Sequence, residues 1–137
     1  MRLQKATQCA LFAVLELAQN PEQQVSAADI AEKYSISANH LAKVMRDLSR
    51  AGLVDSMRGA GGGYRFSGNA KRVTLYEIVK MFEDVGQEGR QEAGDDSPIG
   101  RALKQVTTEI DEITVSTLKS ITLSTLMKLT QRHQSQP

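Results

Sequence analysis

The sequence predicts a mainly α-helical protein with one small β-hairpin and a long helix near its C-terminus. Three observations point to this fold class. Apolar residues recur at helical spacing along most of the chain, and a glycine-rich run separates two short β-prone stretches. Ser97-Pro98 then opens a segment in which apolar residues repeat every three or four positions. The length of 137 residues is enough for one domain with a helical extension.

Three helices are expected before the glycine run. The first spans residues 6–19 and stops at Pro21, which cannot continue a helix. Ser26 stands three residues before Asp29 and caps a short second helix. Ser37 caps a third helix that ends at about residue 51. Candidate core residues of the second and third helices are Ala28, Ile30, Ala31, Leu41, Val44, Met45 and Leu48.

The hairpin and a fourth helix follow. Residues 53–58 and 64–67 are β-prone, and the glycines between them predict a loop longer than a tight two-residue turn. Thr74 and Glu77 form a second capping box, which opens a helix that continues to Phe82. Residues 1–82 are therefore expected to form one domain.

The remainder is expected to be a loop and two helices. Residues 83–97 are polar, acidic and glycine-containing, which predicts a mobile loop. The long helix begins at Pro98, and a last helix runs from residue 123 to about residue 131. Apolar and small residues of the long helix repeat about every 3.5 positions, as in a helix that packs along a partner helix. They are Ile99, Leu103, Val106, Ile110, Ile113 and Thr117. We favour a homodimer interface over packing within the chain, which makes residues 98–137 the dimerisation region.

Charge is unevenly distributed along a chain whose formal net charge is only +1. Residues 33–72 hold eight basic and two acidic side chains, whereas residues 83–100 hold six acidic side chains and one arginine. A basic block within a nearly neutral chain is typical of a nucleic-acid-binding face, although a solvated surface could also carry it.

Several classes of protein are excluded by composition and spacing. No apolar run has the length of a signal peptide or of a membrane span, so we expect a cytoplasmic protein without membrane contact. A dinucleotide-binding motif would need glycine where Tyr64 stands, and no Gly-Lys-Ser/Thr sequence closes the glycine run. No catalytic constellation has supporting context, so we expect no enzymatic activity.

The order of elements predicts a winged helix-turn-helix. Two helices joined by a short turn and followed by a basic hairpin place the third helix in the major groove of DNA and the hairpin, or wing, over the backbone. Outward residues of the third helix and its cap are Ser37, Asn39, His40, Lys43, Arg46 and Asp47. Arg58 and Arg65 would reach phosphates or the minor groove, Gly61 lies in the bend of the wing, and Tyr64 packs the wing onto the domain.

Three stretches resemble, in the same order, the Rrf-type family of bacterial winged-helix regulators, to which IscR, NsrR and CymR belong. They are MRLQKATQCALFAVLELA, IAEKYSISANHLAKVMRDLSRAGLVDSMRGAGGGYRF and SITLSTLM. The resemblance implies a homodimeric transcription regulator, usually a repressor, that binds a partly palindromic double-stranded DNA operator. It also implies that Ser37, Asn39, His40 and Lys43 lie at base- and phosphate-reading positions, and that Arg2 approaches the DNA backbone.

The chain departs from the iron–sulfur members of that family. Those members carry three cysteines between the fourth helix and the long helix, whereas the corresponding interval here has none. The thiol and imidazole ligands of the whole chain are Cys9, His40 and His133. We therefore expect no cluster and no other cofactor. The alternative is a metal- or cluster-binding regulator that uses non-cysteine ligands together with Cys9.

The signal to which such a regulator would respond stays open. Cys9 is either a small buried hydrophobic residue or a redox-sensing thiol activated by Lys5, four residues earlier. A small-molecule effector of unknown identity is the other candidate. His40 could be a pH switch or metal ligand, and Asp95 with Asp96 could bind a cation, but DNA contact and a solvated loop explain these residues more simply.

Overall fold

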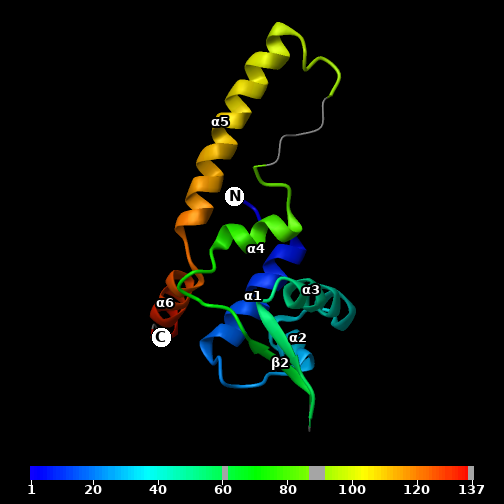
Figure 1. Ribbon diagram of the computed structural model, residues 1–137, viewed down its shortest axis with the longest axis vertical. Helices are drawn as coiled ribbons and strands as arrows, with labels where there is room; N and C mark the ends of the chain where they lie inside the picture. Colours follow the sequence, from blue (N-terminus) through cyan, green and yellow to red (C-terminus); the bar gives the residue numbers. More distant parts are fainter. Residues whose placement is uncertain (60–61, 87–91, 136–137) are drawn as a thin grey trace.

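The computed structural model confirms a mainly α-helical chain with a two-stranded antiparallel sheet (Figure 1). It describes residues 1–59, 62–86 and 92–135. The elements within these ranges are α1 (Lys5–Gln19), α2 (Ala27–Tyr34), α3 (Ala38–Arg50), β1 (Val54–Met57), β2 (Gly63–Phe66), α4 (Leu75–Phe82), α5 (Pro98–Ser120) and α6 (Leu123–Gln134).

Hydroxyl side chains begin the four helices for which the sequence predicts a cap. Each accepts a hydrogen bond from the backbone N–H three residues later, which satisfies a donor that the helix itself leaves unpaired. The pairs are Ser26 Oγ with Asp29 N (3.1 Å), Ser37 Oγ with His40 N (3.2 Å), Thr74 Oγ1 with Glu77 N (3.3 Å) and Ser97 Oγ with Gly100 N (3.0 Å). The starts of α2, α3, α4 and α5 are therefore confirmed.

Two local expectations are wrong. Ala28 is exposed, because the buried side of α2 carries Ala27, Ile30 and Ala31, and Ala28 is about 100° around the helix from Ala27. The last helix continues to Gln134 instead of ending near residue 131. The basic side chains of its last turn interact favourably with the negative end of the helix dipole, which supports the longer helix.

The core is aliphatic and is built around α1. Its fully buried side chains come from five helices and one strand, and they include Val14, Leu17, Ile30, Leu41, Met45, Leu48, Val54, Ile78 and Leu123. Because α1 packs against α3, α4, β2 and α6, it fixes the helix-turn-helix, the hairpin and the C-terminal helix relative to one another.

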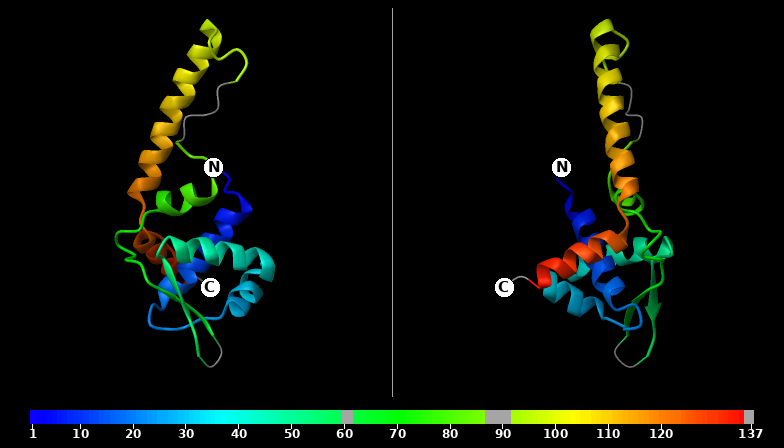
Figure 2. Two further views of the ribbon diagram at one scale, coloured as in Figure 1. Left: turned by 45° about the vertical axis from the view of Figure 1, so that its right-hand side comes forward. Right: turned by 90° about the vertical axis from the view of Figure 1, so that its left-hand side faces the viewer.

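The long helix α5 rises from this body as a separate rod (Figures 1 and 2). Its lower end is held by backbone hydrogen bonds between the α5–α6 junction and the segment before α4. Leu75 N donates to Ile121 O (2.8 Å), and Leu123 N donates to Val73 O (2.9 Å). The C-terminal part of α5 contacts α4 and buries Leu118, whereas residues 101–113 are all exposed.

Of the expected loop 83–97, residues 87–91 lie outside the described residues. The described part before this gap, residues 83–86, contacts other segments of the chain. The Glu83 carboxylate accepts a hydrogen bond from the Gln4 backbone N–H at 3.0 Å. A Cβ atom added to Gly86 would lie 2.5 Å from Val115 Cγ2, so the backbone approaches α5 closely at this glycine. The N-terminus, the end of α4 and the base of α5 are thereby held together.

A polar cluster joins α1 to α2 on the surface. The Glu16 carboxylate accepts hydrogen bonds from Lys33 Nζ, at 2.8 Å, and from the Tyr34 hydroxyl. Phe12 stacks on Tyr34 with ring centroids 5.0 Å apart. Burial acts to raise the pKa of Glu16, but the two hydrogen bonds and the Lys33 charge outweigh burial and lower it. The hydrogen bond to Glu16 raises the pKa of Lys33, and burial followed by the hydrogen bond to Glu16 raises the pKa of Tyr34.

Replacing Glu16 with glutamine is expected to lower the free energy of unfolding by about 1 kcal/mol at pH 7, because one partner of the pair is solvent-exposed. A lowered carboxyl pKa contributes stability above its unfolded value of about 4.3 and loses it as pH falls through the folded value. The raised pKa values of Lys33 and Tyr34 contribute stability that is lost as pH rises through their folded values.

Urea denaturation from pH 3 to pH 11 measures this pH dependence. The difference between wild type and Glu16→Gln should be largest near neutrality and should shrink at both extremes. Glu22→Gln, at an exposed carboxylate, is the control and should change stability little at any pH. A difference for Glu16→Gln that does not vary with pH would contradict the charge-based account.

Candidate nucleic-acid interface

A three-residue turn sets the angle between α2 and α3. Ser35 has a left-handed backbone with φ of 54°, which reverses the chain after α2. Ile36 is buried, and its N–H donates to Ala31 O at 2.9 Å. Ser37 then starts α3. The turn therefore anchors the beginning of α3 to the core and leaves the other face of that helix in solvent.

The exposed face of α3 and its cap carries four of the residues expected to contact DNA. Ser37, Asn39, Lys43 and Arg46 are all exposed. His40 differs from the expectation, because its side chain is only partly exposed and Nε2 is a buried atom with no hydrogen-bond partner. The imidazole therefore turns partly towards the body of the protein, so the prediction that His40 is simply an outward residue is corrected.

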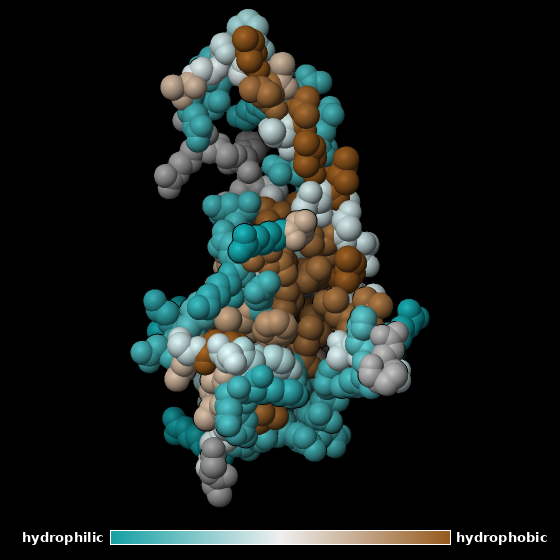
Figure 3. Space-filling model, turned by 180° about the vertical axis from the view of Figure 1, so that it is seen from behind, coloured by the Kyte–Doolittle hydropathy of each residue, from teal (hydrophilic) through white to brown (hydrophobic). Residues whose placement is uncertain are grey.

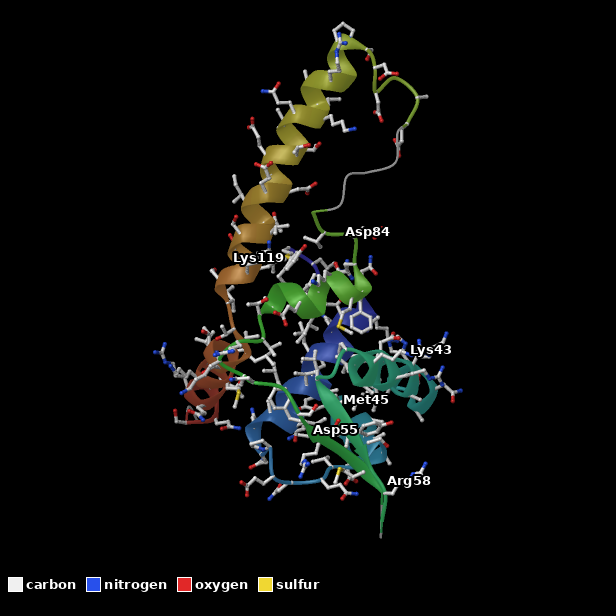
Figure 4. All side chains as sticks on the ribbon, in the orientation of Figure 1. Lys43, Met45, Asp55, Arg58, Asp84 and Lys119 are labelled. Atoms are coloured by element: carbon white, nitrogen blue, oxygen red, sulfur yellow. The ribbon has the colours of Figure 1, made fainter. Side chains whose placement is uncertain are left out.

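The hairpin places further positive charge on the same side of the molecule as α3. Its strands pair Val54 with Phe66 at the base and Met57 with Gly63 towards the tip. Arg58 is exposed where β1 ends, and Arg65 is exposed on β2. Figure 4 shows Lys43 on α3 and Arg58 on the hairpin projecting from the same side. Arg2 is exposed at the amino end, and Gly61 lies outside the described residues.

A third segment holds the hairpin in position. Val25, in the loop before α2, pairs with Tyr64: Val25 N donates to Tyr64 O at 3.0 Å, and Tyr64 N donates to Val25 O at 2.8 Å. The Tyr64 side chain packs against the core, as expected of a residue that fixes the wing. Gly63 permits this approach, because it has φ of 147° and an added Cβ would lie 2.8 Å from Val25 O. Sequence patterns miss this bridge, because a single paired residue has no periodic signal.

The expected dimer seam is exposed along α5. Ile99, Leu103, Val106, Ile110 and Ile113 are between 53% and 76% accessible, and Thr117 is also exposed. From behind, the apolar side chains form a stripe along α5 that continues onto the body (Figure 3). An apolar stripe of this extent on one face of a projecting helix is typical of a surface that another protein covers.

Cys9 lies in α1 with 4% of its surface accessible. Burial raises the pKa of its thiol, and the charge of Lys5 offsets burial only in part. A thiolate activated by Lys5 requires an exposed cysteine, and the structure does not meet this condition. These observations favour the interpretation of Cys9 as a small buried hydrophobic residue.

We expect native Cys9 to react with a disulfide reagent at least about 100-fold more slowly than in the urea-unfolded chain, because only the accessible thiolate is nucleophilic. Absorbance of the released thiolate measures both rates. DNA affinity of Cys9→Ser should match that of the wild type in peroxide and in reductant alike. A peroxide response that the wild type shows and Cys9→Ser lacks would establish the sensing role instead.

The metal-ligand set does not fit an iron–sulfur cluster. The chain has a single cysteine, which is buried in α1, whereas clusters are held by several thiolates or by thiolates with imidazoles. Among residues 1–59, 62–86 and 92–135, no three histidine, cysteine, aspartate or glutamate side chains gather closely enough to hold a metal ion. The metal-binding alternative through Cys9 therefore finds no supporting group of ligands in the part of the chain that the structure describes.

Comparisons with known proteins agree with this geometry. The model of the Rrf2 family, described as iron-dependent transcriptional regulators, matches residues 3–129. A protein of Rhodopseudomonas palustris named as the HTH-type transcriptional regulator BadM is 56% identical over 99% of this chain and 88% of its own length. The structure of CymR, the global cysteine regulator of B. subtilis, superposes with a TM-score of 0.78 at 26% identity, over 94% of this chain and 98% of CymR. T. potens IscR superposes with a TM-score of 0.73 at 26% identity, over the whole chain and 93% of IscR.

These similarities confirm the winged-helix fold and the expectation of a DNA-binding regulator in place of an enzyme. No helix in the described residues is long and apolar enough to cross a membrane. The single cysteine of the chain does not supply the thiolates that an iron–sulfur cluster needs, so the iron of the family description is not assigned to this chain as a cluster. The chain belongs to the Rrf2 family of transcriptional regulators.

Proposed function

We propose that the chain is a cytoplasmic repressor that binds a partly palindromic double-stranded DNA operator as a homodimer. The observation that carries this proposal is the combination of a basic recognition face with the uncovered apolar face of α5. A two-fold dimer through α5 would present two copies of α3, and dimeric helix-turn-helix proteins read half-sites about 34 Å apart.

The second copy is the occupant that best suits the α5 face. A helix of 23 residues is about 35 Å long, and two such helices can pack side by side with their apolar residues in register. A two-fold interface uses the same patch on both chains, so the patch must complement itself. The stripe from Ile99 to Ile113 meets this requirement, since it is apolar throughout and carries no charge of its own.

Residues of α3 and of the hairpin would then divide the work of recognition. Asn39, near the N-terminal end of α3, can pair with adenine in the major groove. Lys43 and Arg46 supply charge to phosphates or to guanine, while Ser37 lies at the helix start, where phosphate binds well. Arg58, Arg65 and Arg2 would neutralise the flanking backbone, with Gly61 and Tyr64 shaping the wing.

Transcription with purified components tests the proposed sign of regulation. Genomic fragments that bind the protein are placed at a promoter, and transcript is measured with and without the protein. We expect less transcript from the promoter that carries the bound fragment and no change from one with the same base composition in shuffled order. An increase in transcript would overturn the assignment as a repressor while leaving DNA binding intact.

The structure favours a small molecule over Cys9 as the signal, because the thiol is buried and its pKa is raised. A ligand that changes the separation or the availability of the two α3 helices would release the operator. To act in this way, such a ligand would bind at a site in contact with α3.

A further inference from the structure

A cleft lies between α3 and two segments that converge on it. Its walls come from the start of α1, the outer side of α3 and the end of α4, and its volume is about 350 Å³. Lys43, which is labelled on α3 in Figure 4, is one of its lining residues. Clefts of about 300–1,000 Å³ are typical of small-molecule sites. Since liquid water occupies about 30 Å³ per molecule, this volume suits a ligand of about a dozen non-hydrogen atoms.

The lining divides into an apolar part and a cationic part. Ala6, Val44 and Phe82 supply apolar surface from all three helices. Lys43, Arg46 and Arg50 supply three positive charges. The lining holds one negative charge, that of the Asp47 carboxylate. Three cations around an apolar floor complement a molecule with an apolar body and an anionic group.

His40 also lines the cleft and is partly exposed. Its Nε2 is a buried atom, so it faces the body of the protein and not the open space of the cleft. A carboxylate in the cleft would therefore be attracted mainly by the neighbouring lysine and arginine side chains.

From these observations we propose that the cleft binds a small monocarboxylate with an apolar body, and that this ligand weakens DNA binding. The coupling rests on the proposed function, in which Lys43 and Arg46 face phosphates or bases. A bound carboxylate would neutralise these cations and occupy the space beside α3. Because linkage is reciprocal, DNA would weaken binding of the carboxylate by the same factor.

Ligand binding is tested first without DNA. The probes are 3-phenylpropanoate and its uncharged amide, titrated calorimetrically into the full-length protein. We expect the carboxylate to bind at least about 10-fold more tightly than the amide, since the amide lacks the charge that the cationic residues attract. Equal binding of both probes, or no binding of the carboxylate, overturns the site.

Two variants locate the binding. Ala6→Leu fills the cleft from α1, and Arg50→Gln removes one cation outside the residues assigned to DNA. Both should weaken binding of 3-phenylpropanoate at least about 10-fold. Ala28→Leu adds the same side chain at an exposed position of α2 away from the cleft, and it should bind like the wild type. Thermal unfolding of each variant shows whether the fold is retained, and wild-type affinity in Ala6→Leu and Arg50→Gln would refute the location.

The coupling is tested by fluorescence anisotropy of labelled operator DNA. Saturating 3-phenylpropanoate should weaken DNA affinity about 10-fold or more for the wild type and for Ala28→Leu, but not for Ala6→Leu. If the carboxylate binds and DNA affinity stays constant, the proposed regulation is wrong. If Ala6→Leu alone weakens DNA binding and no carboxylate binds, the cleft seats a DNA phosphate instead. A protein that binds the carboxylate but no DNA would contradict the proposed function and retain the ligand site.

Discussion

Replacing Ile110 with aspartate is expected to produce a folded monomer that has lost at least about 100-fold in operator affinity. Ile110 lies midway along the apolar face of α5 and is 55% accessible, so the charge costs little in the free chain. In a two-fold dimer the substitution occurs twice and buries two unpaired carboxylates, each of which costs several kcal/mol. Two linked recognition modules bind DNA with an affinity about 10²–10⁴-fold higher than one module, and a monomer lacks this increase.

Sedimentation velocity and DNA anisotropy measure the two consequences together. Thr108→Asp is the matched control, because it places the same charge on the same helix about 200° away, on a face that lacks the apolar stripe. Thr108→Asp should remain dimeric and bind DNA like the wild type. Circular dichroism should show that Ile110→Asp keeps the helix signal of the body. Any decrease in helix signal should be no larger than the contribution of α5, which has lost its partner helix. A dimeric Ile110→Asp protein would disprove the α5 interface.

Replacing Asn39 with alanine is expected to cost about 1–3 kcal/mol of operator binding, a loss of roughly 5- to 150-fold, and to relax preference at one base pair of each half-site. Asn39 is exposed in the first turn of α3, and alanine is a better helix former. The fold should therefore be retained, and a loss of affinity can be attributed to a lost contact.

Arg58→Ala provides the contrast, because a phosphate contact carries no sequence information. We expect this substitution to weaken binding to operator DNA and to random-sequence DNA by a similar factor. The slope of the logarithm of affinity against the logarithm of salt concentration should become shallower by about one unit. Asn39→Ala should leave both the salt dependence and binding to random DNA unchanged. Lys43→Ala should resemble Arg58→Ala more than Asn39→Ala if its main contact is a phosphate. An Arg58→Ala protein with wild-type affinity at every salt concentration would contradict the assignment of the wing.

Local signals explain why most of the fold could be predicted from the sequence. Ser26, Ser37, Thr74 and Ser97 satisfy backbone donors three residues ahead, a pattern that depends on neighbours in the chain. The apolar spacing in α5 is likewise visible without tertiary structure. The misplaced burial of Ala28 has a simple cause: alanine is apolar but small enough to lie on either side of a helix.

Contacts between distant segments could not be predicted in this way. The bridge between Val25 and Tyr64 joins residues far apart in sequence, and neither residue type identifies its partner. The cleft needs Ala6, Phe82 and α3 to meet, which follows only from the packing of α1 against α3 and α4. The partial burial of His40 has the same origin, since helical position alone placed it outward.

The central claim is that two copies of this chain read one symmetric DNA site. It is tested most directly by selecting genomic DNA fragments with the purified protein, sequencing them, and determining the stoichiometry of the complex by native mass spectrometry. We predict a partly palindromic motif with half-sites about one helical turn apart and two chains on each site. Selected fragments that share no motif, or a single chain bound to an asymmetric motif, would contradict the claim.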